Sequence, residues 1–119
     1  MKKILVIEDN PLNMELITDI LEVQGYEIHP YNNAEDGIRA VGEHMPDVIL
    51  MDIQLPGMDG LTATKILKKE SSTKDIPVLA LTAHAMTGFE ESALEAGCVG
   101  YITKPINTRT IVQQIADLC

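Results

Sequence analysis

The sequence predicts an α/β fold in which helices cover both faces of a parallel sheet, and three observations lead to this prediction. Short apolar runs with β-branched residues recur along the chain, as in 4–7 and 48–51, and such runs are typical of strands buried on both faces. Segments whose apolar residues have helical spacing alternate with these runs. The connecting loops are short, which favours parallel strands joined by right-handed crossovers.

Five apolar runs are predicted to be the strands of this sheet. The second run contains Pro30, which cannot donate a hydrogen bond into a sheet and therefore predicts an edge strand. The third run breaks off at Asp52, and Pro56-Gly57 and Asp59-Gly60 then force a loop. The predicted strands cover residues 3–7, 26–31, 48–51, 78–81 and 99–103.

Each predicted strand is followed by the start signal of a helix. Asn10 is a helix cap before Pro11 at the first helical position, and Gly25 closes this helix. The inward stripe of the first helix is predicted to be Leu12, Leu16, Ile17, Ile20, Leu21 and Val23. The other helices are predicted over 34–45, 59–69, from within 83–87 to 96, and from a cap at 107 or 108 to 119.

The composition is that of one folded domain with an aliphatic core. A chain of 119 residues suits a single domain, so we expect one domain over residues 1–119 without an internal linker. Hydrophobic residues make up 45% and charged residues 23%, which argues against disorder. Because only 3% of the residues are aromatic, aliphatic side chains must fill the core.

The charge balance excludes two classes of partner. The chain has 9 Lys+Arg against 18 Asp+Glu, a formal net charge of −9, which repels nucleic-acid phosphates and anionic membranes. Direct binding to nucleic acid or membrane is therefore not expected, whereas a basic protein or a cation is attracted.

Targeting and cysteine signals favour a cytoplasmic protein. Met1-Lys2-Lys3 and the apolar run after it could be mistaken for a signal peptide, but Glu8-Asp9 interrupts that run too early, and no run has transmembrane length. Cys98 and Cys119 have neither metal-ligand nor redox-motif spacing, so we expect ordinary thiols of a cytosolic protein.

The carboxyl ends of parallel strands meet at one edge of the sheet, where ligands bind in folds of this class. The strand ends bring Glu8, Asp9 and Asp52 to this edge. Three neighbouring carboxylates repel one another unless a cation or protons relieve them, and hard oxygen ligands suit Mg²⁺. A divalent-metal site follows as a prediction.

A hydroxyl at Thr82 and an ammonium at Lys104 are expected at the same edge, after the fourth and fifth strands. They suit the equatorial oxygens of a phosphoryl group in transfer, with Asp52 as the nucleophile that forms an acyl phosphate. Each residue alone has an ordinary alternative: a helix-entry acid, a helix cap, a loop aspartate or a solvated lysine. Their coincidence at four strand ends outweighs these alternatives.

Four marks in this order resemble the receiver (response-regulator, CheY-like) domain of two-component signal transduction, and the resemblance spans essentially the whole chain. They are Glu8-Asp9, Asp52 with the following Pro56-Gly57-Met58-Asp59-Gly60, Thr82-Ala83 and Lys104-Pro105.

The resemblance implies a flavodoxin-like, doubly wound sheet of five parallel strands in the order 2-1-3-4-5 with five helices. It also implies that Asp52 accepts a phosphoryl group from a histidine kinase or a histidine phosphotransfer protein. Mg²⁺ would be bound by Glu8, Asp9, an oxygen of Asp52 and the backbone carbonyl of Gln54. Such a domain is a phosphoprotein of a phosphorelay and catalyses only its own phosphorylation and dephosphorylation.

The resemblance also assigns the residues that bind the phosphoryl group and transmit the signal. Thr82 and Lys104 would contact the phosphoryl oxygens, and the Lys104–Pro105 bond would be cis. Thr82 and Tyr101 would form a switch that alters the surface of the fourth helix, fifth strand and fifth helix for a downstream protein. The domain would be a monomer or a phosphorylation-dependent dimer.

Two further assignments concern the acyl phosphate and the phosphodonor. The resemblance implies that Gln54 and His84 lie beside the path of the water that hydrolyses the acyl phosphate, and an ordinary surface histidine stays the alternative for His84. The first helix, with Asn13, Met14 and Ile17, is a candidate docking face for a helical kinase or phosphotransfer domain.

Three alternative functions involve the same residues. A phosphohydrolase with an aspartate nucleophile needs a second acid two residues after Asp52, where Gln54 stands. A flavin or nucleotide carrier needs a phosphate-cradling nest, which Glu8-Asp9-Asn10-Pro11 does not offer. A receiver excised from a hybrid kinase or a multidomain regulator stays open beside a stand-alone regulator.

Overall fold

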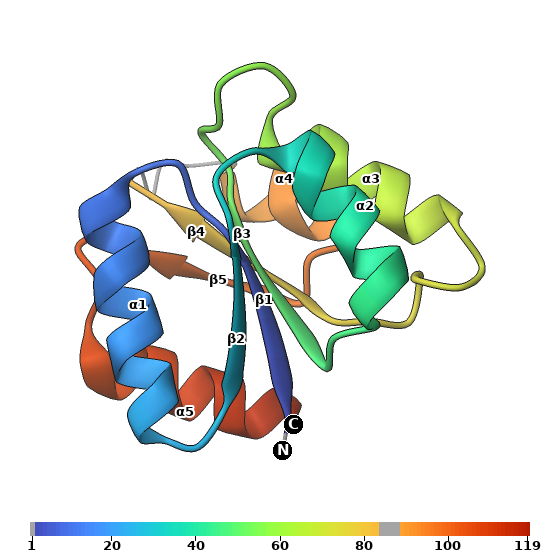
Figure 1. The fold of residues 1–119 in the computed structure, drawn as a ribbon. Helices are drawn as coiled ribbons and strands as arrows, with labels where there is room; N and C mark the ends of the chain where they lie inside the picture. The colour runs from blue at the N-terminus through green and yellow to red at the C-terminus, as the bar shows by residue number, and fades with distance from the viewer. Residues whose placement is uncertain (1, 84–88) are drawn as a thin grey trace.

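The computed structural model describes residues 2–83 and 89–119 and contains a sheet of five parallel strands in the order β2-β1-β3-β4-β5. Figure 1 shows α1 and α5 on one face of this sheet and α2, α3 and α4 on the other. The predicted fold class and strand order are confirmed. The elements are β1 (Lys3–Ile7), α1 (Pro11–Val23), β2 (Glu27–Tyr31), α2 (Ala34–His44), β3 (Val48–Asp52), α3 (Gly60–Lys69), β4 (Val78–Thr82), α4 (Phe89–Ala96), β5 (Gly100–Thr103) and α5 (Thr108–Leu118).

Each face of the sheet has its own aliphatic core. Alternate residues of a strand point to opposite faces, so Ile4 and Val6 of β1 belong to one cluster and Leu5 and Ile7 to the other. One cluster includes residues of α1 and α5, and the other includes residues of α2, α3 and α4. The strands β3 and β4 are buried along their whole length, which explains their continuous apolar sequence.

The edge position of β2 agrees with the prediction from Pro30. Within the sheet β2 pairs only with β1, and Pro30 lies opposite Val6 in the parallel register. None of the five β2 residues is fully buried.

The inward stripe predicted for α1 is too wide. Ile17 and Leu21 are fully buried, but Leu12 and Val23 are 75% and 82% exposed and Leu16 is 42% exposed. Ile17 and Leu21 are one helical turn apart and face the sheet, whereas Leu12 and Leu16 form a second stripe about 100° away. This second stripe gives α1 an apolar surface that the core does not use.

Polar caps fix the helix starts near the carboxyl edge of the sheet. Asn10 Oδ1 accepts hydrogen bonds from the backbone N–H groups of Leu12 and Asn13, and Asn107 Oδ1 accepts one from Thr110. The predicted caps of the first and last helices are therefore confirmed. Among the described residues, no helix has both the length and the apolar content needed to cross a membrane.

Candidate functional site

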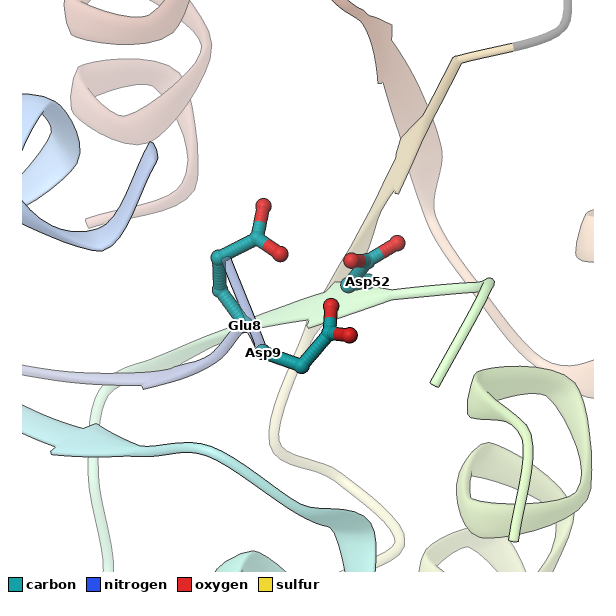
Figure 2. A group of neighbouring side chains, drawn as sticks. All are labelled: Glu8, Asp9 and Asp52. Carbon is teal, nitrogen blue, oxygen red and sulfur yellow. The ribbon is translucent and has the colours of Figure 1, made fainter. Parts of the chain in front are cut away.

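The ends of β1 and β3 bring three carboxylates together at the carboxyl edge of the sheet. Ile7 of β1 pairs with Met51 of β3 in the parallel register. Glu8 and Asp52 are the next residues along these two neighbouring strands. Each of Glu8, Asp9 and Asp52 offers a carboxylate oxygen, and these oxygens lie within 4.8 Å of one another. Figure 2 shows the three side chains gathered at the strand ends. Glu8 and Asp52 are buried, and Asp9 is exposed.

Lys104 inserts its ammonium group between the two buried carboxylates. Its Nζ lies 2.8 Å from Glu8 Oε1 and 3.0 Å from Asp52 Oδ2. Lys104 follows β5, and its backbone N–H donates to the carbonyl of Thr82 at 2.7 Å, which holds this loop against the end of β4. The Lys104–Pro105 bond is cis, as the resemblance to receiver domains implies.

The second oxygen of Asp52 is bound by its own turn. The backbone N–H of Gln54 donates to Asp52 Oδ1 at 3.0 Å. Ile53, between them, donates its backbone N–H to the carbonyl of Leu81 at 3.0 Å, which extends the pairing of β3 with β4 by one residue. The orientation of the Asp52 carboxylate is thus set by an ammonium on Oδ2 and a backbone amide on Oδ1.

Thr82 ends β4 beside this carboxylate. Asp52 pairs with Leu81 in the parallel register, so Thr82 is one residue beyond the partner of Asp52. The Thr82 side chain is buried. The topology therefore places Thr82 at the end of the strand beside the one that carries Asp52, and its backbone carbonyl is bound by the Lys104 N–H.

The crowded acids change one another's protonation. Burial raises the pKa of Asp52 to about 7, and the neighbouring Glu8 carboxylate adds to this effect while Lys104 opposes it. For Glu8, burial acts upward, but its contacts with Asp52 and Lys104 and the hydrogen bond from the Asn10 amide lower its pKa overall. For Lys104, burial acts downward, but the two carboxylates raise its pKa overall. One ammonium thus stabilises the charge of Glu8 and only partly that of Asp52.

The donor set fits a hard divalent cation. Glu8 Oε1 is buried and forms an ion pair with the Lys104 ammonium at 2.8 Å, but it accepts no hydrogen bond among the described residues. Glu8 Oε2 accepts from the backbone N–H of Asn10 at 3.2 Å. The cluster therefore has three carboxylates against one ammonium, and carboxylate oxygens are ligands that suit Mg²⁺.

Comparison with known proteins identifies the family. The profile of the response regulator receiver domain matches residues 4–116. The chain belongs to the response regulator receiver family. A relative, the polar-differentiation response regulator DivK of Brucella anthropi, is 45% identical over 114 residues, which cover 96% of this chain and 93% of DivK.

Solved structures of other receivers and response regulators have the same fold as this receiver. The crystal structure of a putative response regulator from Chloroflexus aurantiacus has a TM-score of 0.94 at 27% identity and covers 98% of this chain and 96% of its own. The receiver domain of the sensor histidine kinase PA1611 from Pseudomonas aeruginosa, with a magnesium ion in its active site cleft, has a TM-score of 0.91 at 32% identity. That match covers 98% of this receiver and 96% of the other chain.

The structure of this receiver brings together most of the predicted site residues, but not all. Glu8, Asp9, Asp52 and Lys104 form one cluster, and the Gln54 side chain is exposed beside it. Tyr101 is half-buried in β5 and packs against the core cluster on the α2, α3 and α4 face. His84 lies outside the described residues.

One predicted docking residue of the receiver is wrong. Ile17 is fully buried in the core, so it cannot belong to a docking face, whereas Met14 and Asn13 are half-buried. The exposed large apolar residues of α1 are instead Leu12, Leu16 and, at the far end of the helix, Val23. Helical spacing alone did not indicate which of two adjacent stripes faces the sheet.

Two features of the receiver site were missed in the sequence. The ammonium of Lys104 pairs with Glu8 as well as with Asp52, which depends on side-chain geometry across three strand ends. The Gln54 amide binds Asp52 Oδ1 in an Asx-type contact two residues apart, and an aspartate followed at once by turn residues was a signal for it.

Proposed function

We propose that this receiver domain, over residues 1–119, accepts a phosphoryl group on Asp52 in a Mg²⁺-dependent reaction and transmits a signal to a protein partner. The observation that supports this most directly is the buried Asp52 carboxylate bound by Lys104 and packed beside Glu8 and Asp9. A buried carboxylate beside two other acids lowers the stability of the fold, which a purely structural role would not explain. The same carboxylate can act as a nucleophile in phosphoryl transfer. The match of the receiver profile over residues 4–116 supports the extent of the domain.

Asp52 performs the transfer as the attacking carboxylate. A bond forms between an oxygen of Asp52 and the phosphorus, and the bond from phosphorus to the histidine nitrogen of the donor breaks. The electron pair of that bond stays on the imidazole nitrogen of the donor. The product is an acyl phosphate on Asp52, and no oxidant or reductant takes part.

The other residues of the site hold charge during this step. Lys104 is within contact of Asp52 Oδ2 and would bind a phosphoryl oxygen after transfer, and the Thr82 hydroxyl would bind another. Glu8, Asp9 and Asp52, together with the Gln54 backbone carbonyl, would hold Mg²⁺. Bound Mg²⁺ would neutralise the carboxylates and the charge on the transferring phosphoryl oxygens.

The donor would be a histidine kinase or a histidine phosphotransfer protein that docks beside the site. Leu12 and Leu16 form an exposed apolar stripe on α1, and Pro11 begins this helix two residues after Asp9. A cavity of about 420 Å³ connects this helix with the end of β2 and is lined by Glu8, Asp9, Pro11, Met14, Pro30, Tyr31 and Asn32. This surface suits a helical partner that presents apolar side chains around its phosphohistidine.

Signalling to a downstream protein would depend on Thr82 and Tyr101. A dianionic phosphoryl group bound by Thr82 would change the loop after β4 and thereby the packing of Tyr101 in β5. We propose a cytoplasmic protein that is a monomer or a phosphorylation-dependent dimer and that binds neither nucleic acid nor membrane, in keeping with its net charge of −9. Its own phosphorylation and dephosphorylation would be its only catalysis.

The test is phosphorylation by a small donor. The protein is incubated with acetyl phosphate and Mg²⁺, and the intact mass is measured for wild type and for Asp52→Asn. Wild type is expected to gain one phosphoryl group and Asp52→Asn none. A phosphoryl group that is retained in Asp52→Asn would refute the assignment, and a magnesium chelator serves as the control for the metal.

A further inference from the structure

The motif after Asp52 ends in a glycine that packs against the backbone of Asp52. Gly60 is the first residue of α3 and is buried. A Cβ atom on Gly60 would lie 2.2 Å from the carbonyl oxygen of Asp52 and 2.9 Å from the Cα of Ile53. Both are main-chain atoms, so rotation of a side chain cannot relieve the clash. Gly60 is not among the described glycines with positive φ, so space, and not backbone conformation, requires a glycine here.

The first turn of α3 is fixed in place and cannot easily retreat from this contact. The Gly60 N–H donates to the carbonyl of Ile53 at 3.0 Å. Asp59 caps the helix by accepting from the backbone N–H and the hydroxyl of Thr62, at 2.9 Å and 3.0 Å. The buried Thr64 hydroxyl donates to the Gly60 carbonyl at 2.8 Å. A methyl group at Gly60 therefore acts on the segment that faces it, the backbone of Asp52 and Ile53.

That backbone segment also determines where the Asp52 carboxylate lies. Its Oδ1 is bound by the amide of Gln54, and its Oδ2 lies 3.0 Å from the Lys104 ammonium. Ile53 is bound in turn to the carbonyl of Leu81. The shift of the main chain that restores an ordinary contact distance to the added Cβ would move the carboxylate away from its partners.

We infer that Gly60 is a positioning residue for the phosphoryl acceptor: its missing side chain lets α3 pack directly on the backbone of Asp52 and so aims the carboxylate. The inference rests on the proposed function of Asp52. A positioning residue acts through geometry, and misplacement of a reacting group by about 1 Å costs roughly 100-fold in rate. Gly60→Ala is expected to slow phosphoryl transfer by at least about tenfold.

Two matched variants separate positioning from general loss of stability. Gly42→Ala makes the same change in α2, where an added Cβ has no atom within 4 Å, and its rate is expected to stay within about twofold of wild type. Thr64→Val removes the hydroxyl that binds the Gly60 carbonyl but adds no atom near Asp52. It is expected to lose about twofold to tenfold in the folding equilibrium, with the transfer rate per folded molecule unchanged.

The measurement is the initial rate of phosphorylation by acetyl phosphate and Mg²⁺, followed by intact mass and divided by the folded fraction from circular dichroism. Mg²⁺ affinity, measured from amide chemical shifts in a magnesium titration, is a second readout that a purely structural residue would not change. Gly60→Ala is expected to weaken Mg²⁺ binding because Asp52 is one of its ligands, whereas Gly42→Ala and Thr64→Val are expected to leave it unchanged.

The outcomes distinguish failure of the positioning role of Gly60 from failure of the proposed function of Asp52. If Gly60→Ala is modified on Asp52 at the wild-type rate, the positioning role is overturned and the proposed function stands. If wild type is not modified, or if Asp52→Asn is modified, the proposed function fails instead. If Gly60→Ala is partly unfolded, its rate is measured under two stabilising conditions. Gly42→Ala is added to the same chain, because alanine favours a helix over glycine, and trimethylamine N-oxide is added to the buffer to favour the folded state. A chain that stays unfolded under these conditions makes Gly60 a folding residue and overturns the inference.

Discussion

Asp52→Asn is expected to stabilise the metal-free protein at neutral and alkaline pH, although it abolishes phosphorylation. The folded protein raises the pKa of Asp52 from 3.8 to about 7 because the carboxylate is buried beside Glu8. A pKa that is raised on folding contributes stability below the unfolded value, and this stability is lost as pH rises through the folded value. The stability that Asp52 contributes is therefore lost between about pH 4 and about pH 7.

The size of the effect follows from the shift. About three pKa units at 1.36 kcal/mol each give roughly 4 kcal/mol as an upper value for the cost of the ionised carboxylate at high pH. Asparagine keeps an oxygen that accepts from Lys104 or from the Gln54 amide, and it carries no charge. Because local relaxation reduces the penalty, the expected gain in unfolding free energy at pH 8 is about 2–4 kcal/mol.

The assay is urea unfolding followed by far-ultraviolet circular dichroism, because the chain contains no tryptophan. Wild type and Asp52→Asn are unfolded in the presence of a metal chelator at several pH values from 4.5 to 8. Their free energies of unfolding are then compared at each pH. The gap between the two proteins should open with rising pH. At pH 8 Glu8 is ionised in both the folded and unfolded states, so its own titration does not contribute to the gap.

Added Mg²⁺ provides the control. A ligand that binds only the folded state stabilises it, and wild type, with one more carboxylate ligand, should gain more than Asp52→Asn. The gap at pH 8 should therefore become smaller in Mg²⁺. A variant that is no more stable than wild type at pH 8 without metal would refute the claim that burial beside Glu8 opposes ionisation of Asp52.

Three further predictions concern the lysine, the core and the surface of the same domain. Lys104→Met removes the only ammonium that the described structure places against Glu8 and Asp52. We therefore expect the free energy of unfolding, measured with urea at pH 8, to fall by up to about 3 kcal/mol. The loss should become smaller at pH 5, where Asp52 takes up a proton. Leu21→Ala should cost about 2–5 kcal/mol in unfolding free energy because Leu21 is fully buried. Leu12→Ala should change stability by less than about 0.5 kcal/mol, since Leu12 is 75% exposed, but should weaken phosphotransfer from a histidine phosphotransfer protein in a phosphotransfer assay. Equal stability losses for the two leucines would contradict the assigned orientation of α1.

The three central strands were predictable because nearly all their residues are buried. The third strand is buried at each of its residues, from Val48 to Asp52, so its apolar run needed no interpretation of period. The order of the strands came from a resemblance, supported by one residue, Pro30, whose missing N–H excludes a central position. The convergence of Glu8, Asp9 and Asp52 then followed from parallel topology alone.

The remaining details depend on packing that spacing does not encode. Leu16 and Ile17 are both apolar and adjacent in the sequence, so periodicity could not show that Ile17 faces the core and Leu16 is 42% exposed. The pairing of Lys104 with Glu8 is the meeting of two flexible side chains from segments nearly a hundred residues apart. The raised pKa of Asp52 requires knowledge of its burial, which the sequence alone does not supply.

The stability of this domain and its proposed chemistry therefore draw on different residues. Burial of the aliphatic clusters on the two faces of the sheet provides the folding free energy. The site at the carboxyl ends of the strands lowers this stability, because two buried acids there face one ammonium. A protein selected only for stability would neutralise Asp52 or expose it. Because Asp52 is instead buried and bound on both oxygens, a change in the core and loss of the acceptor should act in opposite directions: Leu21→Ala should reduce stability without altering the acceptor, and Asp52→Asn should raise the stability of the metal-free protein at pH 8 while removing it.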